Sequence, residues 1–299
     1  MLNAEQKKQT DAVENRLNKL RAHTPHAIDR LRRIRVDDGR QRRPTARRYF
    51  RRIDILPTRA HRTVAQSTQG AATIVVLTRF SIFDMGDRCF RLTRQTNDAN
   101  ETWRRLYDRQ RLERKFAYFE RLTLPSIVNQ TDNNWQWHIY YGATMPDEFV
   151  QRLRRLCAPY WRILCTPVDS LRQFRHCVKS ILEQFLSDDS YVTVRLDDDD
   201  ALHQSFFERL QTYSDRCHHL VSFPNGSRIT FDAANDLFCV GSDVHSRNTA
   251  VGLAAVQFNV YEAGKHTTVH KRYKVHYDTT SQMYYVACDS WCDTARAFR

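Results

Sequence analysis

Four consecutive aspartates, Asp197, Asp198, Asp199 and Asp200, are the residues of this sequence with the clearest capacity for chemistry. Adjacent carboxylates repel one another unless a cation or several hydrogen-bond donors neutralise them. Sites built only of oxygen ligands suit Mg²⁺ or Mn²⁺. The run therefore predicts a divalent metal site that holds a phosphorylated substrate, with a solvated acidic turn as the alternative.

The segment before the aspartates, residues 191–196, is short, apolar and rich in β-branched side chains, which predicts a buried strand. Open α/β sheets bind their ligands beyond the C-terminal ends of the strands. Side chains on an extended segment alternate, so Asp197 and Asp199 would share one face, and Asp198 and Asp200 the other. The alternation does not decide which pair faces the site.

Alternating strands and helices precede this segment. Arg79 lies just beyond the first predicted strand, where a guanidinium can bind a phosphate or a carboxylate. The pattern predicts an α/β domain with a mostly parallel sheet, right-handed crossovers and helices on both faces, followed by a mixed α+β part. Strands are predicted at 73–77, 135–141 and 161–165, and helices at 101–121, 145–157 and 171–185.

The positive charge of the chain is concentrated near its N-terminus. Residues 1–70 hold 18 Lys and Arg against 7 Asp and Glu, which is +11 of the total formal charge of +13. We therefore expect a basic arm at 1–70, made of short amphipathic helices or disordered, and a nearly neutral body at 71–299. Basic helices of this kind bind anionic membrane surfaces or nucleic acid.

The cellular compartment of the protein and the redox state of its cysteines are predicted from features that the sequence does not have. The eight cysteines lie mostly in apolar runs and are expected to be reduced, because a chain of 299 residues does not need disulfide bonds to fold. No stretch is long and apolar enough for a membrane span, and the N-terminus has no hydrophobic signal core. We expect a cytoplasmic protein, or one that is peripheral on the inner face of a membrane.

Several segments resemble the putative rhamnosyltransferase family, a branch of the GT-A glycosyltransferases. The resemblance runs from about residue 73 to 290. It rests on the blocks LTRF at 77–80, FERLTLPSI at 119–127, QTD at 130–132 and RLDDDDA at 195–201.

The resemblance implies a GT-A-like Rossmann-type fold, with a nucleotide-sugar half at 71–202 and an acceptor half at 203–299. It implies a metal-dependent transfer of a sugar, rhamnose by the family name, from a nucleotide-sugar donor to a glycan or glycolipid acceptor in polysaccharide biosynthesis. The family has a histidine near the position where this chain has Cys288. The implied donor-binding residues are Thr78, Arg79, Asp132, Arg195, Asp197 and Asp198, and the implied ligands of Mn²⁺ or Mg²⁺ are Asp198, Asp199, Asp200 and His266.

Three points stay open at this level. The acceptor base is not selected among Asp232, Asp236 and Asp243, which all lie in the acceptor half. A metal-dependent phosphotransferase or nuclease could use the same aspartates, although the body is not basic and nucleases usually spread their carboxylates over several strands. A nucleic-acid-binding or anionic-surface-binding protein that acts through residues 1–70 is the other alternative, with nucleic acid the less favoured partner.

Overall fold

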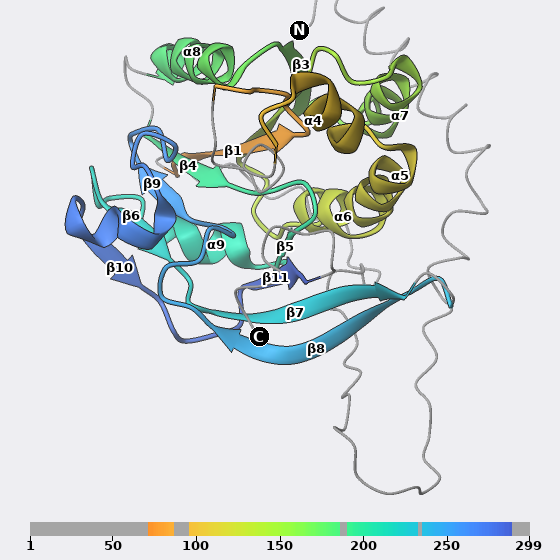
Figure 1. Cartoon of the computed structure of the whole chain (residues 1–299). Coiled ribbons are helices and arrows are strands. Elements are labelled where there is room, and N and C mark those ends of the chain that lie inside the picture. The colour runs from red at the N-terminus through yellow and green to blue at the C-terminus, as the bar shows by residue number, and fades with distance from the viewer. Residues whose placement is uncertain (1–70, 87–95, 186–189, 233–234, 289–299) are drawn as a thin grey trace, which may run out of the picture. The chain divides into compact units, whose positions relative to one another are not determined.

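The computed structural model describes residues 71–86, 96–185, 190–232 and 235–288 (Figure 1). All of them belong to one compact unit, Ile53–Arg299. The predictions made for the arm at 1–70 fall outside the described residues, as do Cys89 and Cys292. The cysteines inside the described ranges are free thiols, as predicted.

The centre of the unit is a seven-stranded sheet. Its strands are β1 (Thr73–Phe80), β2 (Trp135–Gly142), β3 (Ile163–Val168), β4 (Tyr191–Arg195), β6 (Leu220–Ser222), β9 (Ala254–Val256) and β10 (Val275–Tyr277). Their order is β10-β6-β9-β4-β1-β2-β3. β1 is parallel to β2 and β4, β2 is parallel to β3, and β9 runs antiparallel to both of its neighbours. The C-terminal ends of β1, β2, β3 and β4 therefore meet at one edge.

Helices cover both faces of this sheet. The helix α8 (Leu171–Leu182) packs Phe174 and Val178 into the core of one face. On the other face lie α5 (Arg109–Tyr118), α7 (Asp147–Cys157) and α9 (Phe206–Gln211), whose apolar side chains share a second core. The predicted α/β class, with a mostly parallel sheet and helices on both faces, is confirmed.

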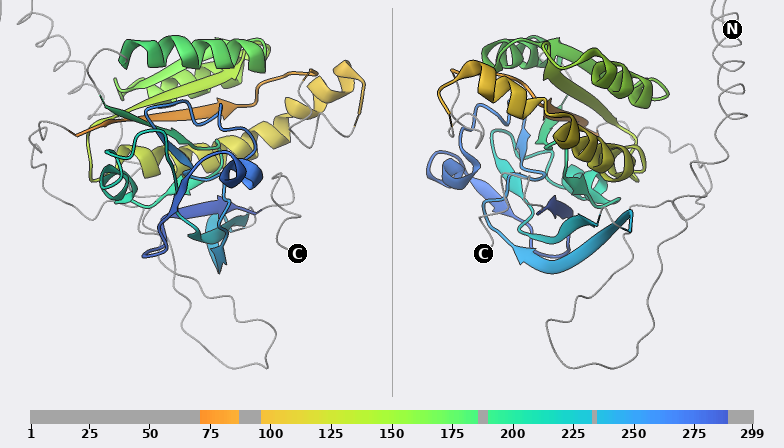
Figure 2. Two further views of the ribbon diagram at one scale, coloured as in Figure 1. Left: turned by 90° about the vertical axis from the view of Figure 1, so that its left-hand side faces the viewer. Right: turned by 45° about the vertical axis from the view of Figure 1, so that its right-hand side comes forward.

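A second sheet lies in the C-terminal part, where the sequence predicts a mixture of strands and loops. It consists of β5 (Ala201–Leu202), β11 (Tyr284–Ala287), β7 (Asn225–Asp232) and β8 (Leu237–His245), in that order. Figures 1 and 2 show β7 and β8 on the side of the unit that is opposite α8. A small core that includes Tyr118, Leu122 and Ile229 joins this sheet to the end of α5 and the helical turn that follows it.

The helix predicted at 101–121 is divided in the structure. α4 (Ala99–Leu106) ends before Asp108, whose side chain accepts a hydrogen bond from the backbone N–H of Arg111 and so caps α5. Aspartate is among the preferred N-cap residues, because its carboxylate satisfies an otherwise unbonded N–H group. α5 then continues without a break into a π turn, η1 (Phe119–Thr123), and into α6 (Leu124–Val128).

Candidate functional site

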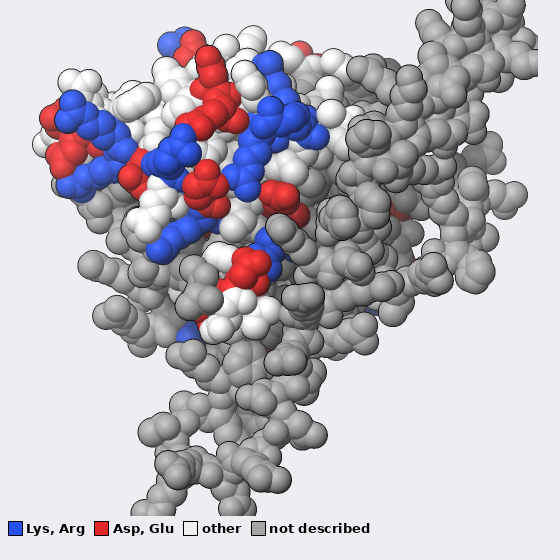
Figure 3. All heavy atoms as spheres, turned by 90° about the vertical axis from the view of Figure 1, so that its right-hand side faces the viewer, with Lys and Arg blue, Asp and Glu red and all other residues white. Residues whose placement is uncertain are grey.

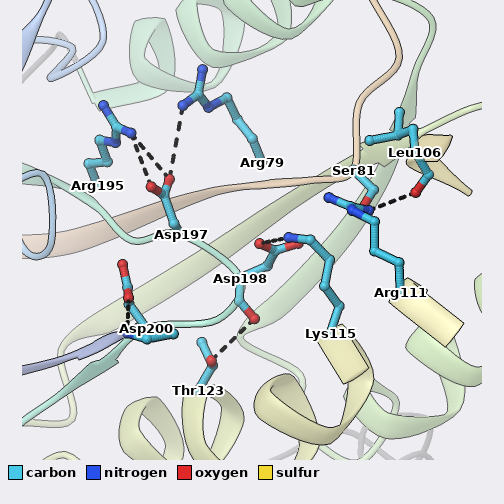
Figure 4. Close-up of polar contacts among 11 residues, drawn as sticks. Arg79, Ser81, Leu106, Arg111, Lys115, Thr123, Arg195, Asp197, Asp198 and Asp200 are labelled. Atoms are coloured by element: carbon cyan, nitrogen blue, oxygen red, sulfur yellow. Dashed lines mark hydrogen bonds and ion pairs between the residues drawn. The ribbon is translucent and has the colours of Figure 1, made fainter. Parts of the chain in front are cut away.

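The acidic run lies at the C-terminal edge of the main sheet, as predicted, but not on a strand. β4 ends at Arg195, and a turn follows in which the N–H of Asp200 donates to the carbonyl of Asp197 at 3.4 Å. Burial alternates along the run: Asp198 and Asp200 are buried, and Asp197 and Asp199 are partly exposed. Because the backbone turns, the run does not present two flat faces, and Asp197, Asp198 and Asp200 contact three different parts of the fold (Figure 4).

Asp197 joins two arginines that come from neighbouring strands. The guanidinium of Arg195, the last residue of β4, donates to both carboxylate oxygens at 3.0 and 3.4 Å. Arg79, near the end of β1, lies 3.9 Å from the same carboxylate. Burial alone would raise the pKa of Asp197, but the two arginines outweigh it and lower this pKa to about 2. Asp197 is therefore ionised at neutral pH, and it holds both guanidinium groups in place.

Tyr261 and His266 complete this group, which we name the arginine cluster: Arg79, Arg195, Asp197, Tyr261 and His266. The guanidinium carbons of Arg79 and Arg195 lie 4.9 and 5.6 Å from the centre of the Tyr261 ring. Burial, followed by the charge of Arg195, lowers the pKa of His266 to about 4, so its imidazole is neutral at pH 7. The structure thus brings His266 to predicted donor-binding residues, and its role as a metal ligand stays a prediction.

Asp198 is held from the other side of the sheet by the helix that begins with α5. The ammonium group of Lys115 forms a short ion pair with Asp198 Oδ1, and the hydroxyl of Thr123 donates to the Asp198 carbonyl at 3.3 Å (Figure 4). Burial alone would lower the pKa of Lys115, but the charges of Asp198 and Asp199 outweigh burial and raise it. The lysine is therefore a charged ammonium ion that partly neutralises the acidic run.

Asp200 connects the acidic run to the second sheet. Its carboxylate oxygen Oδ1 accepts a hydrogen bond from the backbone N–H of Ala287 at 2.9 Å, at the end of β11. Burial first, and then the nearby charges of Asp199 and Asp197, raise the pKa of Asp200 well above its usual value. The contact gives Asp200 a role in joining the two sheets. Cys288 follows directly, and its backbone N–H donates to the carbonyl of Ile229 at 2.9 Å.

The loop after β1 is fixed in an uncommon conformation beside these residues. Ser81 has a φ of 47°, in the left-handed region that residues other than glycine seldom adopt. The hydroxyl of Tyr107 donates to the Ser81 carbonyl at 3.0 Å, and Arg111 donates to the carbonyl of Leu106 at 2.6 Å. Gly142 is required beside this loop, because a Cβ atom would come within 2.2 Å of the Tyr107 hydroxyl. Backbone strain of this kind is concentrated at functional sites.

Besides Asp198, which pairs with Lys115, two predicted donor-binding residues lie outside the arginine cluster. Thr78 is fully buried, and its hydroxyl accepts a hydrogen bond from the indole N–H of Trp137 at 2.9 Å. Asp132 lies in the turn before β2, where it accepts from the N–H of Asn134 at 2.6 Å. Because β2 and β4 run in the same direction, this turn lies at the opposite edge of the sheet from the acidic run. The structure thus gives both residues contacts within the fold, and their donor contacts stay predictions that it does not support.

Of the three candidates for the acceptor base, two lie on strands of the second sheet and Asp236 lies in the turn between β7 and β8. Asp232 ends β7 and accepts from the side chain of Asn235 at 2.8 Å. Asp236 is exposed and forms an ion pair with Arg121 at 2.5 Å. Asp243 lies in β8 and accepts from the hydroxyl of Ser227 at 3.3 Å. These contacts do not select one of the three, so the base stays open.

The carboxylates do not form a metal site as they stand. Within the described ranges, no three His, Cys, Asp or Glu side chains are placed so that they could hold one metal ion. Lys115 binds one oxygen of Asp198, and the other oxygen, Oδ2, is buried and accepts no hydrogen bond from any described residue. Asp198 therefore has one free ligand atom, which is too few for a site that the protein supplies alone.

Sequence reasoning missed Lys115, Thr123 and Tyr261. A signal for Lys115 is present, because it lies three residues after Leu112 and directly before Phe116, on the buried stripe of α5. A lysine at such a position must find a counter-ion inside the protein, and the acidic run is the available one. No comparable signal marks Thr123 or Tyr261, whose contacts depend on how distant segments pack.

The surface formed by α4, α5 and α7 carries both signs of charge. Figure 3 shows Lys and Arg side chains interleaved with Asp and Glu over this face. Arg109 pairs with Glu148 at 2.6 Å, and Arg152 pairs with Glu113 at 2.6 Å. This face is therefore not the basic patch that nucleic-acid binding requires. None of the helices in the described part of the chain has both the length and the apolar character needed to cross a membrane.

Several solved structures are similar to the chain at low sequence identity, and this chain spans less than two thirds of the length of each of three such structures. S. aureus TarS 1–349 in complex with UDP is 8% identical, with a TM-score of 0.42 over 72% of this chain and 60% of that chain. GalNAc-T7 with UDP, GalNAc and Mn²⁺ is 11% identical, with a TM-score of 0.41 over 74% and 44%. The mannosyltransferase PcManGT from Pyrobaculum calidifontis, in complex with GDP-Man and Mn²⁺, is 11% identical, with a TM-score of 0.41 over 78% and 63%.

No curated protein matches this sequence. One family does, and its match extends over residues 73–290, from the first residue of β1 to just beyond β11. The match includes the arginine cluster, the acidic run and both sheets, and it covers well over half of the chain. The chain belongs to the family described as "Putative rhamnosyl transferase".

Proposed function

We propose that this protein is a glycosyltransferase that moves a sugar from a nucleotide-sugar donor to a glycan or glycolipid acceptor. The observation that carries the proposal is the pair of largely buried arginines, Arg79 and Arg195, at the ends of two adjacent parallel strands. Their side chains are 13% and 16% exposed, and Asp197 holds both. Two guanidinium groups at this edge of an α/β sheet suit the diphosphate of a nucleotide sugar. The family description makes rhamnose the first sugar to test.

The arginines would act on the leaving group. When the bond between the sugar and the diphosphate breaks, negative charge grows on the departing phosphate oxygen. Charged groups that are already fixed stabilise this charge without reorganising, which is the main source of catalysis in reactions of this type. Asp197 keeps Arg79 and Arg195 oriented before the donor binds, and the Tyr261 ring lies against both and limits the access of water.

A divalent metal ion would enter this site only together with the donor. The chain offers Asp198 Oδ2 and the partly exposed Asp199, and the remaining oxygen ligands would have to come from the donor diphosphate and water. A bound Mn²⁺ or Mg²⁺ would supply further charge for the leaving diphosphate. The acceptor hydroxyl needs a base, for which Asp232, Asp236 and Asp243 stay the candidates.

The test is a panel of nucleotide sugars, including rhamnose donors, offered to the full chain with and without Mn²⁺. We expect hydrolysis or transfer of at least one donor, and binding of the matching nucleoside diphosphate in calorimetry. Arg79→Met and Arg195→Met should each weaken this binding by about tenfold to a hundredfold, because each removes a charged hydrogen-bond donor. Arg155→Met, at an exposed position of α7, is the matched control and should change nothing. Absence of both turnover and nucleoside-diphosphate binding would falsify the proposal.

A further inference from the structure

Lys115 and Asp198 form a buried ion pair in the middle of a site that is expected to bind a metal. Their side chains are 17% and 4% exposed. Lys115 uses Asp198 Oδ1, whereas Asp198 Oδ2 is buried and accepts no hydrogen bond from the described residues. Asp198 therefore has one oxygen occupied by a cation of the chain itself and one oxygen ready to bind something else.

The carboxylates of Asp197 and Asp200 also have partners within the chain. Asp197 binds Arg195 and Arg79, and Asp200 binds the backbone N–H of Ala287. A divalent ion placed at Asp198 would lie close to the Lys115 ammonium group and would be repelled by it. The repulsion acts at short range and in a buried place, where it is screened little. Among the described residues, no three acidic, histidine or cysteine side chains are placed to hold a metal ion, and Lys115 offsets part of the negative charge that such an ion needs.

The π turn η1 aligns the two groups that hold Asp198. Lys115 and Thr123 are eight residues apart, which in a regular α-helix is a rotation of about 800°, or about 80° beyond two full turns. A π turn holds one extra residue, so the spacing acts like seven residues and about 700°, within about 20° of two turns. Lys115 then reaches the Asp198 carboxylate, and Thr123 reaches the Asp198 carbonyl (Figure 4).

We propose that Lys115 is the resident cation of the donor site, which occupies Asp198 in the free protein and excludes divalent metal ions until a nucleoside diphosphate binds. The diphosphate brings the missing oxygen ligands and attracts the ammonium group, which frees Asp198 for the metal. Lys115 is thus a positioning residue that makes metal binding conditional on the donor. This inference rests on the proposed function, because it requires a diphosphate ligand.

The test measures binding of Mn²⁺ alone by electron paramagnetic resonance, with the full chain, and then repeats it with UDP, GDP and dTDP. The wild type should bind Mn²⁺ weakly without nucleotide and at least about tenfold more tightly with the matching nucleoside diphosphate. Lys115→Met should bind Mn²⁺ about tenfold more tightly than the wild type when no nucleotide is present. Lys115→Arg keeps the cation and should behave like the wild type. Lys179→Met, at an exposed position of α8, is the matched control.

Each outcome decides a different point. If the wild type binds Mn²⁺ equally well with and without nucleotide, the proposal is wrong, and this comparison needs no variant that might fail to fold. If Lys115→Met folds, as circular dichroism would show, but leaves Mn²⁺ binding unchanged, Lys115 does not exclude the metal, although the proposed transferase function stands. If no nucleoside diphosphate binds under any condition, the proposed function itself fails.

Discussion

Helix α5 carries ion pairs on two faces, and the two faces differ in how much water reaches them. On the outer face, the side chains of Arg152 and Glu113 are 30% and 48% exposed, and their charges lie 2.6 Å apart. On the inner face, those of Lys115 and Asp198 are 17% and 4% exposed. An exposed pair adds little to stability, because water and salt screen both charges. A buried pair fixes geometry, and breaking it leaves a charge without compensation.

A third pair lies between these extremes. Asp278, after β10, is a buried carboxylate with 1% of its side chain exposed, whereas its partner Arg209 is 37% exposed. The three pairs form a graded series of burial in one protein. If burial governs how much an ion pair contributes to stability, the loss in the free energy of unfolding on breaking each pair must follow the order of burial. Single substitutions at these positions test that order.

The largest effect is expected for Lys115→Met. It leaves Asp198 buried without its cation, so the free energy of unfolding should fall by about 3 to 5 kcal/mol. Urea denaturation of the full chain measures this change. Lys115→Met combined with Asp198→Asn removes both charges and should recover most of the loss. If Lys115→Met lowers the free energy of unfolding by less than about 1 kcal/mol, this pair contributes no more to stability than an exposed pair does.

Asp278→Asn is expected to have the next largest effect, and it depends on pH. Burial acts to raise the pKa of Asp278, but hydrogen bonds from Arg209, Thr280 and Tyr213 outweigh it and lower this pKa to about 2. A lowered pKa in the folded state means that the carboxylate stabilises the fold above about pH 4 and that this contribution is lost as the pH falls toward 2. Asp278→Asn should destabilise the protein at pH 7, by less than Lys115→Met does, and should flatten the acid limb of the stability profile. Identical acid limbs for both proteins would contradict this.

Thr123→Val tests the second contact to Asp198. The substitution keeps the shape of the side chain and removes the hydrogen bond to the buried Asp198 carbonyl, so we expect a loss of about 1 kcal/mol in the free energy of unfolding. Thr212→Val is the matched control, because the Thr212 hydroxyl donates to the carbonyl of Arg209 in an exposed position. Equal losses at the two positions would show that burial does not strengthen this contact.

Glu113→Gln should have the smallest effect. It breaks the pairs with Arg152 and Arg109 on the exposed face of α5, and the free energy of unfolding should change by no more than about 0.5 kcal/mol. The same denaturation experiment measures it, at low and at high salt. If Glu113→Gln lowers the free energy of unfolding as much as Asp278→Asn does, the charged side chains on the face in Figure 3 stabilise the protein cooperatively rather than as separate pairs.

Local sequence patterns were sufficient to predict where in the fold the acidic run lies. The β-branched segment before Asp197 predicts a strand, and alternation of strands and helices predicts that this strand is parallel to the first predicted strand, at 73–77. Both predictions are confirmed, so the meeting of Arg79 and Asp197 at one edge follows from the topology alone. Asp132 shows the limit of such reasoning, because its block resembles the family while its side chain lies before a strand and thus at the other edge.

The sequence by itself determined the class of the fold and the edge of the sheet at which the acidic run lies, because strand and helix periodicity and consecutive carboxylates are visible in a linear chain. The type of chemistry stays a prediction from the same carboxylates. Tertiary structure decided what each aspartate does. A turn after Arg195, a π turn in the helix that begins with α5, and the position of β11 assign Asp197 to two arginines, Asp198 to Lys115 and Asp200 to a backbone N–H. These partners lie between 2 and 118 residues away along the chain, and only the packing of helix and sheet brings the distant ones together.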